Sequence, residues 1–170
     1  MNSVKLINNT IKIPVEAVEE HGAWLEAISI NSDRDVVVKG NVVINGGKTL
    51  VSYGSSNILI TNNTFKNEKL VEGTELQIDA DSQNVLIINN SFYGLWEAIE
   101  VYAYKNITIA GNFITQSDLG IKIEPFTSSE ITDVYVFRNI LNGSDLFILG
   151  CNSLTIKNNT IKDCEIYIED

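Results

Sequence analysis

The sequence predicts an all-β fold in which the chain winds as a solenoid of short parallel strands. Three observations support this prediction. β-Branched residues and Asn are common, with 24 Ile, 14 Val and 20 Asn among 170 residues. One short phrase recurs along the whole chain, and its apolar residues alternate with period two instead of a helical period. We expect about seven turns in a single domain over residues 1–170, a length typical of one domain.

The recurring phrase consists of an apolar alternation, an Asn and a second apolar alternation. Its copies lie 20 to 32 residues apart, with a mean of 25. Each phrase predicts two short strands, which pair with their counterparts one turn away at about 4.8 Å. The Asn between them tolerates the left-handed backbone of a tight bend, and its amide can bond to the Asn above and below. Gly40 and Gly111 fit the same corner. The seven index positions are Asn9, Asn41, Asn63, Asn90, Asn112, Asn139 and Asn159.

A third strand is expected about seven to twelve residues after each index Asn. Because side chains alternate across a strand, every second residue must point into the core. The inward pairs are Ile28/Ile30, Leu50/Ser52, Leu76/Ile78, Ile99/Val101, Ile121/Ile123, Leu146/Ile148 and Ile166/Ile168. The outward residues form two rows, which are Ser29, Val51, Gln77, Glu100, Lys122, Phe147 and Tyr167, and beside them Asn31, Tyr53, Asp79, Tyr102, Glu124, Leu149 and Glu169.

Three insertions interrupt the repeat. Residues 14–22 combine an early Pro, several acids and a closing Gly, which predicts one or two helical turns near the N-terminal end. Residues 66–73 and 125–132 leave the turn on opposite sides of the third-strand face, where we expect them to wall a cleft.

A β-sandwich with Asn-rich turns is the alternative fold. It requires tight hairpins between strands, for which Asn-Gly is the usual signal. Only Asn45-Gly46 and Asn142-Gly143 provide one. The solenoid is therefore the preferred prediction.

These Asn-corner repeats resemble the right-handed parallel β-helix of the pectate-lyase-like superfamily, over about residues 4–169. The resemblance implies the fold strongly and the function weakly, because the superfamily includes lyases, hydrolases, epimerases, phage tailspikes and non-catalytic adhesins. It also implies that the third-strand face carries the substrate groove, and it favours a surface-exposed or extracellular location.

The middle of the two outward rows has the chemistry of a sugar-binding face. Carboxylates and amides can bond to pairs of hydroxyl groups, and an aromatic ring can cover the apolar face of a pyranose. The alternative is that these charges only pair across strands. The predicted substrate-binding residues are Gln77, Asp79, Glu100, Tyr102, Lys122 and Glu124.

An acid precedes the third strand in six turns and suggests an acidic ladder. Carboxylates stacked at about 4.8 Å repel one another and can attract a cation such as calcium. That separation is close to the carboxylate pair of a retaining glycosidase. The alternative is that these acids are turn residues that point apart into water. The six acids are Glu26, Glu75, Glu97, Asp118, Asp145 and Glu165.

The polygalacturonase-like branch of the superfamily matches only in part. Residues 116–121 and 142–146 look like its two acidic motifs, so Asp118 and Asp145 carry over as catalytic acids. Ser144 replaces another acid, and the His and Arg-Ile-Lys motifs are missing. Pectate lyases use Arg or Lys as a base near acids, a role that Lys122 could imitate. Glu97 with Glu100 is the other candidate acid pair.

Charge and composition exclude several partners. The net charge of −10 and the pI near 4.5 argue against nucleic acid. No apolar run is long enough for membrane insertion, and we expect no signal peptide in this chain. Cys151 and Cys164 are expected to be free thiols. The C-terminal residues read as an uncapped strand, which predicts a homo-oligomer or the continuation of a longer chain.

Three functional hypotheses remain open. The first is a carbohydrate-recognising module of surface or viral type that binds a polysaccharide without a cofactor. The second is a polysaccharide hydrolase or lyase. The third is a structural rod that serves as a spacer or an oligomerisation element.

Overall fold

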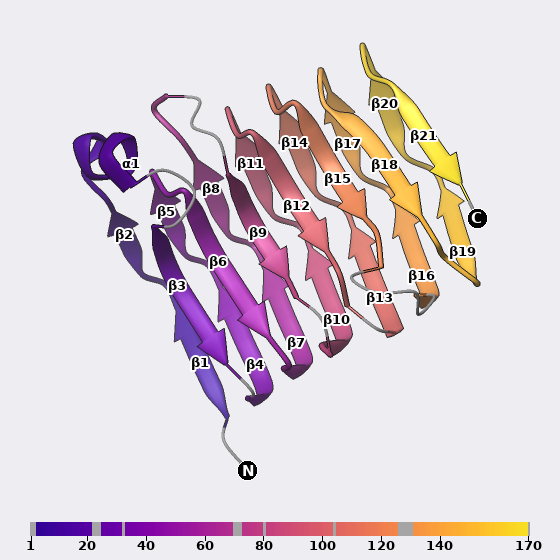
Figure 1. Cartoon of the computed structure of the whole chain (residues 1–170), viewed down its shortest axis with the longest axis horizontal. Coiled ribbons are helices and arrows are strands. Elements are labelled where there is room, and N and C mark those ends of the chain that lie inside the picture. Colours follow the sequence, from indigo (N-terminus) through magenta and orange to yellow (C-terminus); the bar gives the residue numbers. More distant parts are fainter. Residues whose placement is uncertain are drawn as a thin grey trace.

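The computed structural model describes residues 3–21, 25–31, 33–69, 73–79, 81–103, 105–125 and 131–169. In this part of the chain, three parallel sheets of seven strands each wind into a solenoid of seven turns (Figure 1). Every strand pairs in parallel with its counterpart one turn away. The predicted all-β parallel β-helix is therefore confirmed. None of the described helices is long and apolar enough to cross a membrane.

Each turn contributes one strand to each sheet. Sheet A consists of β1 (Val4–Ile7), β4 (Arg34–Lys39), β7 (Ser56–Thr61), β10 (Gln83–Ile88), β13 (Lys105–Ala110), β16 (Thr132–Phe137) and β19 (Leu154–Lys157). Sheet B consists of β2 (Thr10–Lys12), β5 (Val42–Ile44), β8 (Thr64–Lys66), β11 (Ser91–Tyr93), β14 (Phe113–Thr115), β17 (Ile140–Asn142) and β20 (Thr160–Lys162). Sheet C consists of β3 (Glu26–Asn31), β6 (Lys48–Tyr53), β9 (Thr74–Ile78), β12 (Glu97–Val101), β15 (Leu119–Ile123), β18 (Asp145–Leu149) and β21 (Ile166–Glu169).

The core is a set of apolar columns that run along the solenoid axis. The register of sheet C stacks the predicted inward residues in columns, for example Leu76 on Ile99 and Ile99 on Ile121. The side chain of Leu50 is outside the described part. In the inner turns, the inward Val and Ile side chains of sheets A and C are buried, and Phe65 stacks on Phe92 with ring centroids 5.1 Å apart. Since β-branched side chains pack well on a pleated surface, the high Ile and Val content has a direct structural cause.

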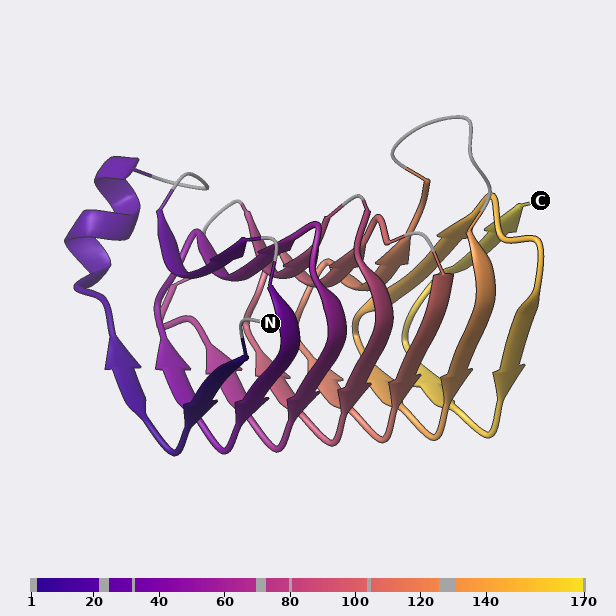
Figure 2. The same ribbon diagram turned by 90° about the horizontal axis from the view of Figure 1, so that it is seen from below.

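The index Asn residues form the predicted ladder at the corner between sheets A and B, where the tight bends line up from turn to turn (Figure 2). Asn41 is typical: its backbone N–H and its side-chain amide both donate to Asn63 Oδ1, at 2.9 and 3.0 Å. The amide also donates to Leu6 O at 2.9 Å. The ladder thus satisfies the buried polar atoms of the bend.

One expectation about this corner is wrong. The left-handed backbone is not at the index Asn but at the residue before it, because the index side chain must turn inward to reach the next rung. Glycine at that preceding position avoids a clash, since a Cβ at Gly40 or Gly111 would collide with the Asn side chain one turn away. The left-handed residues are Asn8, Gly40, Asn62, Asn89, Gly111, Arg138 and Asn158.

The insertions lie at the two ends of sheet C strands. The first contains α1 (Val15–His21), which lies within the predicted 14–22 segment at the N-terminal end of the solenoid (Figure 1); Gly22 is outside the described residues. Val18 is its buried residue, and Glu19 pairs with Lys69. The other two insertions lie between β8 and β9 and between β15 and β16. Residues 70–72 and 126–130, which would form the predicted cleft walls, are outside the described part of the chain.

The described residues end with β21, whose outer edge no further strand of the described chain covers. Ile166 and Ile168 belong to the inward columns of sheet C, yet they are 56% and 48% exposed. The two cysteines are free thiols, as predicted. Cys151 lies at the corner between sheets C and A, and Cys164 at the corner between sheets B and C.

Candidate functional site

The outer face of sheet C brings the predicted binding residues together. Gln77 on β9, Glu100 on β12 and Lys122 on β15 are paired on three consecutive rungs. Tyr102 and Glu124 lie two residues further along the same strands' path, on the same face. Strand alternation therefore places the side chains as the sequence predicts.

Lys122 is the centre of an ion-pair cluster. Its Nζ lies 2.8 Å from Glu100 Oε1, 2.8 Å from Glu124 Oε1 and 3.9 Å from Glu97 Oε1. The Tyr102 hydroxyl donates to Glu100 Oε1 at 2.5 Å, and Lys122 Nζ lies 5.6 Å from the centroid of the Tyr102 ring. We call Glu97, Glu100, Tyr102, Lys122 and Glu124 the Lys122 cluster. It holds three carboxylates and one ammonium group.

The cluster is recessed, although outward positions were expected to face solvent. Glu100 is 5% exposed, and the Lys122 side chain is 17% exposed. Burial alone lowers the pKa of Lys122, but hydrogen bonds to Glu100 and Glu124 and attraction by nearby carboxylates raise it above its ordinary value. Lys122 therefore stays protonated at neutral pH, which argues against the predicted role as a lyase base. Burial and the bond to Glu100 likewise raise the pKa of Tyr102.

Gln77 carries a polar atom without a partner. The residue is 8% exposed, and its side-chain Oε1 accepts no hydrogen bond. A buried acceptor left unpaired costs about 1–3 kcal/mol. Asp79 follows β9, and its backbone N–H donates to Ser52 O at 2.8 Å. Gln77 thus offers an unused acceptor one rung from Glu100.

The predicted acidic ladder is not continuous. Glu97 lies between Thr74 and Leu119 on the neighbouring rungs, and Lys48 interrupts the row beside Glu26, as the sequence already shows. A register shift between Leu119 and Ile121 then places Asp145 beside Leu119. Glu97 is therefore not stacked on another acid, whereas Asp145 and Glu165, which directly precede the paired Leu146 and Ile166, lie on adjacent turns. The side chain of Glu75 is outside the described part.

Asp118 and Asp145 do not join the Lys122 cluster. Asp118 is exposed at the corner before β15, and its carbonyl accepts the Asp145 backbone N–H at 3.1 Å. The Asp145 carboxylate accepts the Glu165 backbone N–H at 2.8 Å. Glu97 and Glu100 both contact the Lys122 ammonium group, whereas Asp118 and Asp145 are joined by a backbone hydrogen bond. Among the described residues, no three His, Cys, Asp or Glu side chains form a group suited to a metal ion.

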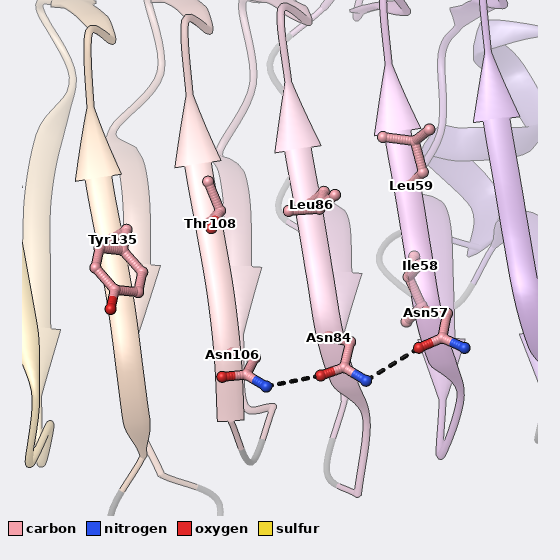
Figure 3. Close-up of a pocket in the computed structure, with 8 residues that line it drawn as sticks. All are labelled: Asn57, Ile58, Leu59, Asn84, Leu86, Asn106, Thr108 and Tyr135. Carbon is pink, nitrogen blue, oxygen red and sulfur yellow. Dashed lines mark hydrogen bonds between the residues drawn. The ribbon is translucent and has the colours of Figure 1, made fainter.

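Sequence reasoning missed a hollow on another face. The outer side of sheet A carries a groove of about 370 Å³, which we call the sheet A groove (Figure 3). A sequence signal for it exists, since four successive turns have Asn or Asp two residues before an outward Leu, Thr or Tyr. The residues that line the groove are Asn57, Ile58, Leu59, Asn84, Leu86, Asn106, Thr108 and Tyr135.

Comparison with known proteins identifies the family. A family described as "Periplasmic copper-binding protein (NosD)" matches residues 3–169. The chain belongs to the NosD family. NosD membership, together with the three parallel sheets, confirms the right-handed parallel β-helix and is consistent with the pectate-lyase-like superfamily. A search of curated proteins finds no match.

The NosD description names copper, and the side chains of this chain do not fit a copper site. Copper in proteins is bound chiefly by thiolate, thioether and imidazole groups. The chain has one His, two Cys and one Met, and Met1 is outside the described residues. His21 is exposed at the end of α1.

The two thiols are also too far apart to share a copper ion. Cys164 Sγ accepts the Ser144 N–H at 3.2 Å, which places it at the start of β18, whereas Cys151 follows the end of that strand. A strand of five residues spans about 16 Å. Cys151 and Cys164 therefore cannot act together as ligands of one copper ion.

Proposed function

We propose that this member of the NosD family is a carbohydrate-binding β-helix that holds a polysaccharide against the outer face of sheet C. The observation that carries the proposal is the Lys122 cluster beside the unpaired Gln77 oxygen. Sugar sites combine a few fixed polar groups with an aromatic surface. Tyr102 supplies the ring, and the carboxylates and the amide supply acceptors for hydroxyl groups.

Mutual ion pairing gives the cluster a fixed geometry before a ligand arrives. Lys122 holds Glu100 and Glu124 at 2.8 Å, and Tyr102 is bonded to Glu100. Pre-organised polar groups lose little conformational entropy when a ligand binds. Glu124, with 26% of its side chain exposed, is the most accessible carboxylate of the cluster.

The charge of the face selects the class of sugar. Three carboxylates surround one ammonium group, and the whole chain carries a net charge of −10. Polymers of uronic acids or sulfated sugars would be repelled. The expected ligand is a neutral polysaccharide or one that carries free amino groups.

Binding fits the geometry better than cleavage does. Glycoside hydrolysis needs one carboxylic acid that can reach the glycosidic oxygen. Glu100 Oε1 already receives hydrogen bonds from Tyr102 and Lys122, and the residue is almost fully buried. Glu100 is therefore poorly placed to protonate a leaving group.

The test compares binding and cleavage in the same samples. Calorimetric titrations would use neutral, amino-sugar and uronic-acid oligosaccharides, and each mixture would be assayed for new reducing or unsaturated ends. We expect Glu124→Gln and Tyr102→Phe to weaken binding. Asp163→Asn, which removes an exposed acid elsewhere, is the matched control. Absence of binding to every oligosaccharide would favour the structural rod, and new chain ends would favour an enzyme.

A further inference from the structure

The sheet A groove is separate from the Lys122 cluster, because the groove lies on a different sheet. Its residues come from β7, β10, β13 and β16, so it runs along the solenoid axis across four turns (Figure 3). We propose that the groove is a second binding site, which holds one strand of an uncharged linear polysaccharide parallel to the axis.

One edge of the groove is a ladder of exposed amides. Asn106 Nδ2 donates to Asn84 Oδ1 at 2.8 Å, and Asn84 Nδ2 donates to Asn57 Oδ1 at 3.0 Å (Figure 3). Asn57 Nδ2 in turn donates to Asp35 Oδ1 at 2.9 Å. A side-chain amide has two N–H donors and two acceptor lone pairs. Asn57 and Asn84 therefore each keep one donor and one acceptor for a ligand.

The floor of the groove is largely apolar. Leu59, Leu86, Thr108 and Tyr135 stand on consecutive rungs, because each is paired with the next in the sheet A register. Leu86 and Tyr135 are each 40% exposed. An apolar floor with an aromatic ring, next to a row of amides, matches a sugar ring, which has apolar C–H faces and polar edges.

The spacing of the groove favours a repeating ligand. The amides recur once per turn, at the strand separation of about 4.8 Å. That period is close to the length of one sugar ring in an extended polysaccharide. A polymer of such rings can therefore offer a hydroxyl or acetamido group to successive rungs without bending.

Other occupants fit the groove less well. None of its lining residues is charged, so neither nucleic acid phosphates nor uronic acids find a cation there. A peptide cannot add as a strand, because β7, β10 and β13 are paired on both sides. A lipid chain would leave the remaining donors and acceptors of the amide row without partners.

The direct test is NMR titration with three hexasaccharides: a β-1,4-glucan, an N-acetylglucosamine polymer and an anionic polygalacturonate. We expect at least one of the two uncharged hexamers to shift the side-chain amide signals of Asn57, Asn84 and Asn106. The uncharged hexamer that shifts them most shows whether hydroxyl or acetamido groups are preferred. Shifts with neither uncharged hexamer at millimolar concentration would overturn the proposal.

Matched variants locate the site. Asn84→Gly removes one amide from the exposed ladder, and glycine tolerates the left-handed backbone at this position. Asn62→Gly makes the same substitution at a left-handed residue outside the groove. Tyr135→Ala is matched by Tyr93→Ala, since Tyr93 is similarly exposed but lies on sheet B, away from both proposed sites. We expect the groove variants to weaken binding about tenfold and the controls to leave it unchanged. Equal losses in a variant and its control would contradict the proposal.

One further variant separates this inference from the proposed function. Loss of binding in Glu124→Gln, with Tyr135→Ala unaffected, would support the sheet C site and overturn the sheet A site. If Tyr135→Ala loses oligosaccharide binding and Glu124→Gln binds as the wild type does, the result would support the sheet A site and overturn the sheet C proposal.

Discussion

Replacing an inner Asn of the buried ladder should destabilise the solenoid far more than replacing an outer one. Asn90 is 1% exposed, and its Oδ1 accepts from both the backbone and the side-chain nitrogen of Asn63, at 3.0 and 2.9 Å. Its amide donates to Ile60 O at 2.9 Å. Asn90→Ala therefore leaves two donors and one carbonyl unpaired inside the bend.

The expected magnitude follows from those three atoms. Each unpaired buried polar group costs about 1–3 kcal/mol, and with partial relaxation we expect a loss of about 4 kcal/mol of unfolding free energy. Asn159 makes equivalent bonds to Asn139 and Val136 but is only half-buried, so water can replace them. Asn159→Ala should cost about 1 kcal/mol.

Urea unfolding followed by circular dichroism measures both variants against the wild type. Asn90→Asp adds a useful comparison, because it keeps the acceptor but buries a charge. The free energy of unfolding that Asn90→Asp loses relative to the wild type should shrink as the pH is lowered to about 4, because the buried carboxylate becomes protonated. A loss below about 1 kcal/mol for Asn90→Ala, or one equal to that of Asn159→Ala, would refute the reasoning.

The remaining predictions concern the site. Lys122→Met leaves three carboxylates without their cation and should cost about 2 kcal/mol at neutral pH, measured by urea unfolding. Because the folded pKa of Lys122 is raised, its contribution is complete below the ordinary lysine pKa and fades as the pH rises above it, so wild type and variant should converge in strong alkali. Gln77→Leu removes an unpaired acceptor and should stabilise the free protein by about 1 kcal/mol while weakening oligosaccharide binding. Neither copper nor calcium should raise the melting temperature of the protein. Binding of one copper ion per chain in equilibrium dialysis would contradict the conclusion that the chain has too few sulfur and imidazole ligands for a copper site.

The fold was predictable because its constraints are local and repeat. An Asn between two apolar alternations must place its amide at a bend, and seven copies fix seven turns. The alternation of Glu100 and Lys122 with buried neighbours then predicted their common face on sheet C. The position of the left-handed residue was not predictable in this way, since two adjacent residues such as Asn8 and Asn9 are both suited to it.

The acidic ladder is interrupted because sequence offsets do not determine register. Corner lengths differ between turns, and a bulge-like shift follows Leu119, so Glu97 and Asp145 each face Leu119 instead of another acid. The recession of Glu100 was also beyond sequence reasoning, because it depends on how Lys122 and Tyr102 fold over it. The sheet A groove does not follow from the resemblance, which implies a site on sheet C only, although the two-residue spacing of Asn84 and Leu86 recurs in the neighbouring turns.

The two amide ladders of this protein run in opposite directions. Along the buried ladder, each amide donates towards the next turn, as from Asn41 to Asn63, whereas along the exposed ladder it donates towards the previous turn, as from Asn84 to Asn57. The exposed row therefore has a polarity, with all its bonded donors aimed at the N-terminal end. A polysaccharide also has two unlike ends. A strand lying on that row would meet donors and acceptors in a fixed order, and would be held in one orientation along the axis.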